Sequence, residues 1–149
     1  MGRGRHARLL AALGAKVFGV DKSIDALRAA REAASGAGQV VRVWCADLTS
    51  APLPSESFEL IVVSRYLQRD LFPAIGAALA PGGVVLYETF TAAQRALGVG
   101  PTSPDHLLEP GELAGRFPGF EQLFYEEVSA PEAVARLAAR KRQRAFSSS

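Results

Sequence analysis

Three short stretches near the start of the sequence carry residues that could bind a nucleoside. Gly2 and Gly4 come directly before an expected helix, and their lack of side chains lets a ligand approach the backbone amides at the helix N-terminus. Asp21 ends the next apolar stretch, where a carboxylate can accept both hydroxyl protons of a ribose. Asp47 and Leu48 end the stretch after that, and they could receive the exocyclic amine and one face of an adenine.

Each of these positions also allows a simpler structural role. Asp21 could be an N-terminal helix cap, and Asp47 could be an ordinary loop acid. The ribose role is favoured for Asp21 because a glycine loop, a helix and a strand-end acid occur together in one compact stretch. Ser64 and Arg65 follow a later buried strand, where a transferred group would lie, although a plain helix start would also explain them.

The pattern of apolar residues predicts alternating helices and strands, which is typical of an α/β fold with a mostly parallel sheet. The order of elements matters because the loops after parallel strands meet at one edge of a sheet. The expected helices cover residues 5–13, 24–34, 67–79 and 110–117, and the expected strands cover residues 16–21, 40–45, 58–63, 84–88 and 120–128.

Two stretches are harder to assign. Residues 131–140 have the alanine content of a helix, and propensity alone favours one, although an antiparallel edge strand from about Val134 is also possible. Residues 89–109 are polar, contain proline and are irregular, so they predict a loop that could cover a site.

Length and composition indicate one domain over residues 1–149, because the chain is 48% hydrophobic and long enough to bury a core. No apolar run approaches the roughly 20 residues of a membrane-spanning helix, and the first residues do not resemble a secretion signal. We therefore expect a cytoplasmic protein without a membrane partner.

Cys45 lies in an apolar run and is expected to be a buried structural thiol, and no metal site is indicated.

The net charge of +2 raises the question of nucleic-acid binding, so the position of the charge matters. Five basic residues follow Glu132, and subtracting them from +2 leaves −3 for the rest of the chain. A basic end from about residue 141, closing with Ser147, Ser148 and Ser149, is more often a solvated tail than a recognition arm. The position of the charge therefore does not indicate a nucleic-acid partner. The five residues are Arg136, Arg140, Lys141, Arg142 and Arg144.

These motifs resemble those of the class I S-adenosylmethionine-dependent methyltransferases, and the likeness covers nearly the whole chain. Residues 2–7 are similar to the second half of that family's glycine motif, residues 20–23 to its ribose motif and residues 46–48 to its adenine motif. The Leu-Ala-Pro-Gly-Gly stretch at 79–83 completes the set, and a nicotinamide-binding domain is not expected to have it.

The resemblance implies a Rossmann-like three-layer α/β/α sandwich with a mostly parallel sheet, and it implies an antiparallel strand at the alanine-rich C-terminal stretch. Family members have an apolar strand just before the position of Gly2, in the middle of the sheet, and Met1 stands there in this sequence. We therefore expect the first central strand to be missing, as in an N-terminally truncated domain. Residues 87–90 and 108–112 resemble a bacterial subgroup described as tellurite-resistance-type methyltransferases.

The resemblance further implies S-adenosylmethionine as the cofactor and methyl transfer to a small-molecule acceptor, with no metal. Arg65, Tyr66 and His106 are candidates for catalysis or acceptor contact, and Arg69 and Arg95 are further polar candidates whose charge would suit a small anionic acceptor. The implied cofactor-binding residues are Gly2, Gly4, Asp21, Lys22, Ser23, Asp47, Leu48, Ser64 and Arg65.

Two other functions stay open. Gly2, Gly4 and Ala7 fit a permissive form of the dinucleotide-binding fingerprint, which would indicate a dinucleotide-binding oxidoreductase domain. The chain could also be an inactive fragment that acts as a binding module through its basic end. The sequence does not reveal the methyl acceptor or the oligomeric state.

Overall fold

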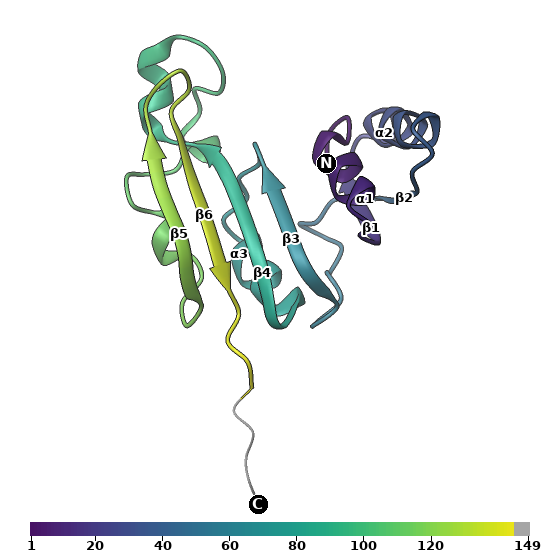
Figure 1. Cartoon of the computed structure of the whole chain (residues 1–149). Helices are drawn as coiled ribbons and strands as arrows, with labels where there is room; N and C mark the ends of the chain where they lie inside the picture. Colours follow the sequence, from purple (N-terminus) through teal and green to yellow (C-terminus); the bar gives the residue numbers. More distant parts are fainter. Residues whose placement is uncertain (145–149) are drawn as a thin grey trace, which may run out of the picture. The chain divides into compact units, whose positions relative to one another are not determined.

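A computed structural model describes residues 1–144, which divide into two compact units. The first unit covers Met1–Ala51, and the second begins at Pro52. Helices and strands alternate in the first unit, whereas a four-stranded sheet dominates the second (Figure 1). The alternation of helices and strands expected from the sequence is confirmed, and the strands form one sheet in each unit.

The first unit contains a two-stranded parallel sheet covered on one face by two helices. Asp21 at the end of the first strand lies opposite Cys45 at the end of the second, so both strands end at the same edge. All four elements agree with the expected ones to within a few residues. They are α1 (Arg5–Ala12), β1 (Val17–Asp21), α2 (Ile24–Gly36) and β2 (Val41–Cys45).

Small residues let the helices of the first unit approach its sheet closely. Val17 of β1 and Val41 of β2 are buried against Ala7 of α1 and Ala34 of α2. The α2 helix begins where expected, because the Ser23 hydroxyl accepts a hydrogen bond from the Ala26 amide at 3.2 Å. Cys45 is exposed, so the expectation of a buried thiol is wrong: β2 presents its last residues to solvent.

The second unit contains a mixed sheet whose strand order is β3-β4-β6-β5. β3 (Phe58–Ser64) and β4 (Leu79–Phe90) are parallel, whereas β6 (Val134–Arg140) runs antiparallel to β4 and to β5 (Glu121–Val128). The helix α3 (Leu71–Ala78) precedes β4, and three short 3-10 helices follow β4: η1 (Ala92–Leu97), η2 (Pro104–His106) and η3 (Leu113–Gly115).

The alanine-rich stretch at residues 131–140 contains the strand β6, as the family resemblance implied. The helix that propensity alone favoured is wrong. Ala135, Leu137 and Ala139 alternate along β6 and are all buried on one face of the sheet. Alternating burial between two antiparallel neighbours outweighs the small intrinsic helix preference of alanine. The pairing of β6 with a neighbour on each side along its own full length fixes this conformation.

Two other expected elements differ from the structure. The helix expected over residues 110–117 is only the 3-10 turn Leu113–Gly115, because Gly111 has a φ of 74° and breaks a helical path. The strand expected over residues 84–88 is the longer β4, which begins directly after α3 and includes the turn expected around Pro81. The register between β3 and β4 shifts near this point, which accommodates the glycines.

The irregular stretch 89–109 is anchored to the sheet by buried polar groups. The buried Gln94 side chain donates to the Val99 carbonyl at 2.8 Å and accepts from the Ala133 amide at 2.7 Å. An isolated bridge between Thr91 and Leu108 joins the two ends of the stretch. Hydrogen bonds therefore hold this segment to the start of β6.

The basic C-terminal stretch is largely engaged within the second unit. The Lys141 ammonium donates to the Gly76 carbonyl at 3.0 Å and to the Leu79 carbonyl at 2.8 Å, at the C-terminal end of α3. Arg144 pairs with Glu56 at 2.8 Å. The expectation of a solvated tail from residue 141 is therefore wrong for Lys141, and Ser147–Ser149 lie outside the described residues.

Within residues 1–144, no helix is both long enough and apolar enough to cross a lipid bilayer.

An ionic cluster around Glu112 ties the 3-10 segment to α3. The Glu112 carboxylate accepts from Arg69 Nε at 2.8 Å, from the Glu109 amide at 2.8 Å and from Arg116. Hydrogen bonds from Arg69, together with those from Glu109 and Arg116, outweigh the effect of burial and lower the pKa of Glu112 to about 2. The side chain of Glu112 is only 12% exposed, so these bonds are largely shielded from solvent.

We predict that Glu112→Gln lowers the free energy of unfolding at pH 7 by about 1–3 kcal/mol, because two arginines lose their carboxylate. The folded-state pKa of about 2 lies below the ordinary 4.5, so the stabilisation is present above about pH 5 and is lost as the pH falls toward 2. Urea unfolding at several pH values measures this difference. The exposed Glu59, changed to Gln, is the control, and an equal or pH-independent loss for both variants contradicts the assignment.

Candidate functional site

The loops after β1 and before α1 meet at the carboxylate of Asp21. The Gly2 amide donates to Oδ2 at 2.9 Å, and the Ser23 amide donates to Oδ1 at 2.9 Å. The N-terminal ammonium of Met1 donates to Oδ2 at 2.9 Å and to the Val20 carbonyl at 2.8 Å. The structure therefore brings Gly2 of the glycine motif to Asp21 and Ser23 of the ribose motif.

These donors keep Asp21 ionised. Burial alone would raise the pKa of the Asp21 carboxyl, but hydrogen bonds from the Ser23 amide, the N-terminal ammonium and the Gly2 amide lower it to about 2. Oδ1 accepts one hydrogen bond, from Ser23, and a carboxylate oxygen has room for a second. Asp21 can therefore accept a further proton donor, such as a hydroxyl, at the edge of the sheet.

Asp47 lies at the same edge of the first-unit sheet, after the neighbouring strand. The Ala46 amide donates to the Asp21 carbonyl at 3.1 Å, which ties the two strand ends together. Oδ1 of Asp47 accepts from the amide and the hydroxyl of Thr49, at 2.9 and 2.7 Å, and these bonds lower the pKa of the carboxyl. Asp47 is exposed and Leu48 is half-buried beside it, so a polar and an apolar contact lie side by side.

The two glycines before α1, Gly2 and Gly4, have different surroundings and different structural roles. A Cβ on Gly4 would lie 2.8 Å from the Cβ of Ala30, so glycine is required there for α1 to pack on α2. A Cβ on Gly2 would meet nothing within 4 Å, and the Gly2 amide points to Asp21. Gly2 therefore has open space beside its Cα while its amide is bonded to Asp21, and Gly4 has a packing role that the sequence did not reveal.

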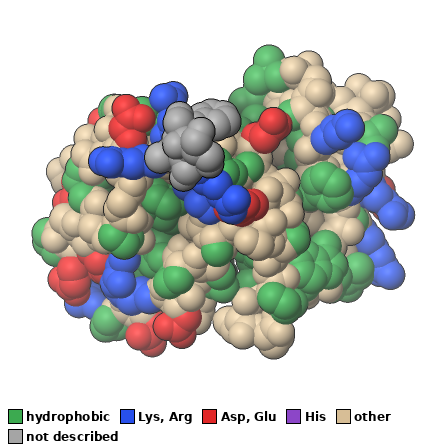
Figure 2. Space-filling view, turned by 90° about the horizontal axis from the view of Figure 1, so that it is seen from below, with side chains coloured by type: hydrophobic (Ala, Val, Ile, Leu, Met, Phe, Trp, Pro, Cys, Tyr) green, Lys and Arg blue, Asp and Glu red, His purple; other side chains and the backbone are tan. Residues whose placement is uncertain are grey.

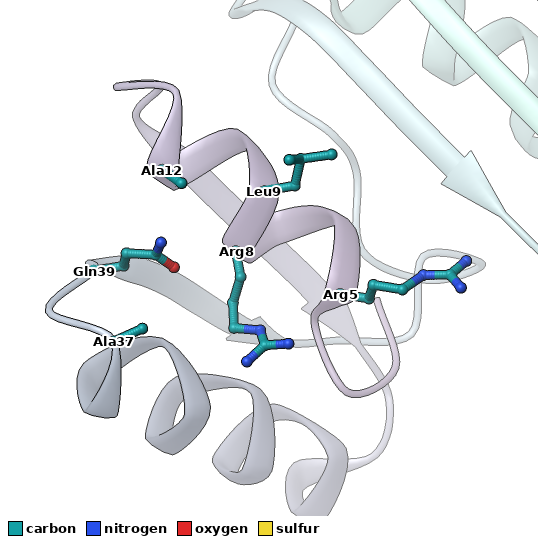
Figure 3. A pocket seen from close by; sticks show the side chains of 6 residues that line it. All are labelled: Arg5, Arg8, Leu9, Ala12, Ala37 and Gln39. Carbon is teal, nitrogen blue, oxygen red and sulfur yellow. The ribbon is translucent and has the colours of Figure 1, made fainter.

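Two hollows lie along the helices of the first unit. The larger, of about 610 Å³, is lined by Gly2 and Arg3 together with Arg8 and one face of α2. The smaller, of about 270 Å³, lies between α1 and the start of β2, with Arg8 and Gln39 in its wall (Figure 3). Neither is lined by Asp21 or Asp47. Only the larger reaches the glycine loop, and the smaller lies away from the strand ends that carry the acids.

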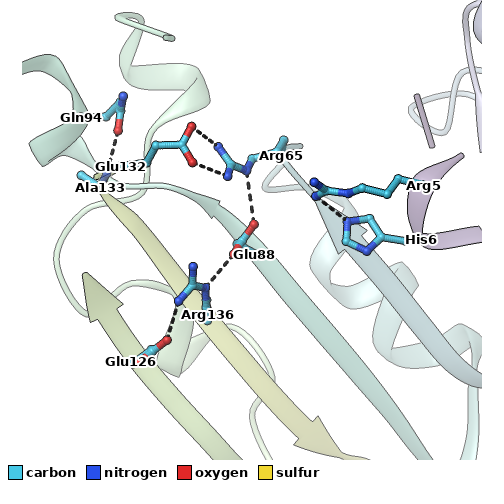
Figure 4. Close-up of polar contacts among 9 residues, drawn as sticks. All are labelled: Arg5, His6, Arg65, Glu88, Gln94, Glu126, Glu132, Ala133 and Arg136. Atoms are coloured by element: carbon cyan, nitrogen blue, oxygen red, sulfur yellow. Dashed lines mark hydrogen bonds and ion pairs between the residues drawn. The ribbon is translucent and has the colours of Figure 1, made fainter. Parts of the chain in front are cut away.

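In the second unit, Arg65 sits at the end of β3 in a left-handed backbone conformation with a φ of 56°. Its guanidinium donates to both oxygens of Glu132, at 2.9 and 2.5 Å, and its Nε donates to Glu88 at 3.2 Å (Figure 4). It also lies over the ring of Phe90, 4.6 Å from the centroid. These carboxylates raise the pKa of Arg65, which is fixed in one position by three side chains.

Glu88 continues this network across the sheet. Its second oxygen accepts from Arg136 Nε at 2.6 Å, and Arg136 also donates to Glu126 at 2.7 Å (Figure 4). Glu88, Glu126 and Glu132 were not predicted from the sequence as partners of Arg65 and Arg136. Alternating charges on neighbouring strands are the signal that could have found them, but only once the strand register is known.

The other candidates for acceptor contact in the second unit, Arg69, Tyr66 and His106, differ in burial and in their hydrogen-bond partners. Arg69 donates to Glu112 and to the Leu107 carbonyl, so its charge is balanced by a carboxylate. The Tyr66 carbonyl accepts from the Tyr87 hydroxyl at 2.9 Å, and the Tyr66 ring is 43% exposed. His106 ends the exposed η2 helix.

The arginines that were expected to suit an anionic acceptor already have hydrogen-bond partners within the protein. Arg65 and Arg69 each pair with at least one carboxylate, and Arg95 donates to the Thr102 carbonyl at 3.0 Å. Ser64 is half-buried next to Arg65, and Lys22 is exposed next to Asp21. Within residues 1–144, no group of three or more His, Cys, Asp or Glu side chains is placed to hold a metal ion.

Comparison with known families assigns the chain to one of them. A family model described as a methyltransferase domain matches residues 1–83, which is more than half of the sequence. The chain belongs to the methyltransferase-domain family. The matched part of this methyltransferase domain includes Asp21, Asp47 and Arg65, and it runs from α1 through the first residues of β4. No curated protein matches the sequence.

Solved structures share the fold of this methyltransferase domain. An S-adenosylmethionine-dependent methyltransferase from Mesorhizobium loti is 24% identical with a TM-score of 0.76, and the match covers 94% of this chain and 87% of that one. TehB from Haemophilus influenzae is 18% identical with a TM-score of 0.77, covering 95% and 55%. A methyltransferase from Methanosarcina mazei is 17% identical with a TM-score of 0.74, covering 95% and 89%. The expected Rossmann-like α/β fold is confirmed.

The left-handed backbone conformation of Arg65 can be tested by substitution. Glycine adopts a φ of 56° freely, whereas other residues lose roughly 1–2 kcal/mol there. We predict that Arg65→Ala and Arg65→Gly both destabilise the protein, and that the glycine variant is the more stable by about 1 kcal/mol. Urea unfolding of the two variants measures the difference. An alanine variant that equals or exceeds the glycine variant in stability excludes the left-handed conformation.

Proposed function

We propose that this methyltransferase domain uses S-adenosylmethionine to methylate a small-molecule acceptor. The observation that carries the proposal is the meeting of the Gly2 amide and the Asp21 carboxylate at one strand end, with Asp47 at the end of the adjacent parallel strand. A carboxylate next to an open glycine and a second carboxylate beside an apolar residue match the needs of an adenosyl group. Family membership and the fold support the same cofactor.

The residues present fit this cofactor. Asp21 is ionised and has room at Oδ1 for a ribose hydroxyl, while the Ser23 amide fixes the backbone after it and Lys22 lies exposed between them. Asp47 is exposed and would accept the adenine amine, with Leu48 against the ring. Gly2 leaves space for the methionine part, and Gly4 keeps α1 close enough to α2 for this arrangement.

When bound, the cofactor supplies a sulfonium methyl group that is already a strong electrophile, so the protein needs only to position a nucleophile and exclude water. Ser64 and Arg65 at the end of β3 are the residues that the family resemblance assigns to the region of transfer. Tyr66 and His106 are the remaining polar candidates for contact with the acceptor. Because Arg65 and Arg69 are paired with carboxylates, they would orient neighbouring loops rather than offer a free positive charge to an anion.

The finer assignment to the tellurite-resistance-type subgroup belongs to the same proposal. It rests on the likeness of residues 87–90 and 108–112, which the structure places in β4 and around Glu112. We also treat residues 1–149 as one methyltransferase domain made of two units. The family match crosses from the first unit into the second, which favours this view over separate functions. The oxidoreductase alternative has no support from the family match.

Calorimetric titration of the full chain with S-adenosylhomocysteine tests the proposal. We predict that Asp21→Asn weakens binding by about tenfold or more, because a neutral amide accepts a hydrogen bond from a ribose hydroxyl less strongly than a carboxylate does. Glu32→Gln, which removes an exposed carboxylate from α2, should leave the affinity unchanged.

Binding that is equal in both variants, or that is stronger for a nicotinamide dinucleotide than for S-adenosylhomocysteine, contradicts the proposal. Circular dichroism of each variant shows whether the fold is retained.

A further inference from the structure

The sheet of the second unit has helices on only one of its faces. α3 lies behind the sheet in Figure 1, and within residues 52–144 no helix lies in front of it. The residues of β4 alternate accordingly: Val85, Tyr87 and Thr89 are buried, whereas Leu86 is 39% exposed on the opposite face. A sheet with one solvated face normally carries polar residues there. The composition of this face is therefore informative.

A row of apolar residues crosses the middle of the uncovered face. The strand register places Val62, Leu86, Ala138 and Phe124 next to one another on β3, β4, β6 and β5. Phe124 is 49% exposed, and Leu60, two residues before Val62, is 37% exposed. Contiguous apolar side chains on an open sheet face indicate a contact surface.

A row of charges runs parallel to the apolar row at one end of the strands. It consists of Arg65, Glu88, Arg136 and Glu126, in the order β3, β4, β6 and β5, so the signs read plus, minus, plus, minus. On the face drawn in Figure 2, acidic and basic side chains of the second unit are likewise interspersed and do not form a patch of one sign. An apolar centre beside a polar rim is the usual composition of a protein interface.

We propose that this face, defined by Val62, Leu86, Ala138 and Phe124 with the adjoining charge row, binds a second copy of the same chain. A two-fold axis that runs along the strands between β4 and β6 reverses the strand order in the facing copy. Each positive charge of the row then faces a negative one: Arg65 faces Glu126, and Glu88 faces Arg136. The row is self-complementary because its signs are opposite at equivalent distances from the centre.

The apolar row fits the same symmetry. The axis places Leu86 opposite Ala138 and Phe124 opposite Val62, so a large side chain meets a smaller one at every position. Face-to-face sheets pack about 10 Å apart, a distance that such large-small pairs can fill. A partner with a single-sign surface would leave half of the charge row facing like charge, which makes a second copy the better occupant.

Sedimentation velocity of the full chain over a range of micromolar concentrations tests this proposal. We expect a species of about twice the 15.8 kDa chain mass at the higher concentrations. Leu86→Lys should weaken association by about tenfold or more, since each dimer contains the change twice. Leu97→Lys is the matched control, because Leu97 is also 39% exposed but lies in η1, outside the sheet.

Two further variants keep the test decisive if Leu86→Lys fails to fold. Phe124→Lys changes the exposed edge strand and should also weaken association. Glu126→Arg should do the same, because it places a positive charge opposite Arg65 of the second copy. A wild-type chain that stays monomeric throughout, or a dimer whose affinity all three sheet variants leave unchanged, overturns the proposal. A monomer whose sheet face binds a different protein overturns it as well.

Discussion

Hydrogen bonds to the Asp21 carboxylate hold the loops of the first unit in the arrangement on which the proposed site depends. Backbone amides on either side of β1 converge on this carboxylate, which keeps it ionised although it is partly buried. The parallel pairing of β1 with β2 then places Asp47 at the same edge. The backbone thereby fixes two acids with different surroundings at the ends of two adjacent strands. Long flexible side chains contribute little to this arrangement. Such a preorganised edge suits a ligand with several hydroxyl and amine donors.

The second unit uses charge differently, because its arginines and glutamates satisfy one another. The Arg65, Glu88, Arg136 and Glu126 row and the Glu112 cluster each join elements that are distant in the sequence. A substrate that approached Arg65 or Arg69 would compete with carboxylates already bound there. Under the proposed function, the selection of an acceptor would depend on shape and on neutral polar groups more than on free positive charge.

The sequence predicted the elements of the first unit well because each has a strong local signal. Ser23 caps α2, β1 ends at Asp21 as expected, and β2 ends at Cys45, two residues before Asp47. The second unit was harder to predict, because its alanine-rich strand β6 is determined by burial between β4 and β5, which local propensity does not report. The site shows the same division. Asp21 and Asp47 could be found from their positions after strands, whereas the packing role of Gly4 and the partners of Arg65 depend on contacts between distant residues.

We have proposed that an adenosyl group binds at the strand ends of the first unit. The most direct measurement is a nuclear magnetic resonance titration of the isotope-labelled full chain with S-adenosylhomocysteine. We expect the amide signals of Ser23, Leu48 and Thr49 to shift together and to reach a plateau as the ligand concentration rises. Shifts confined to the hollow between α1 and β2, around Arg8 and Gln39, with unchanged strand-end signals, would contradict it.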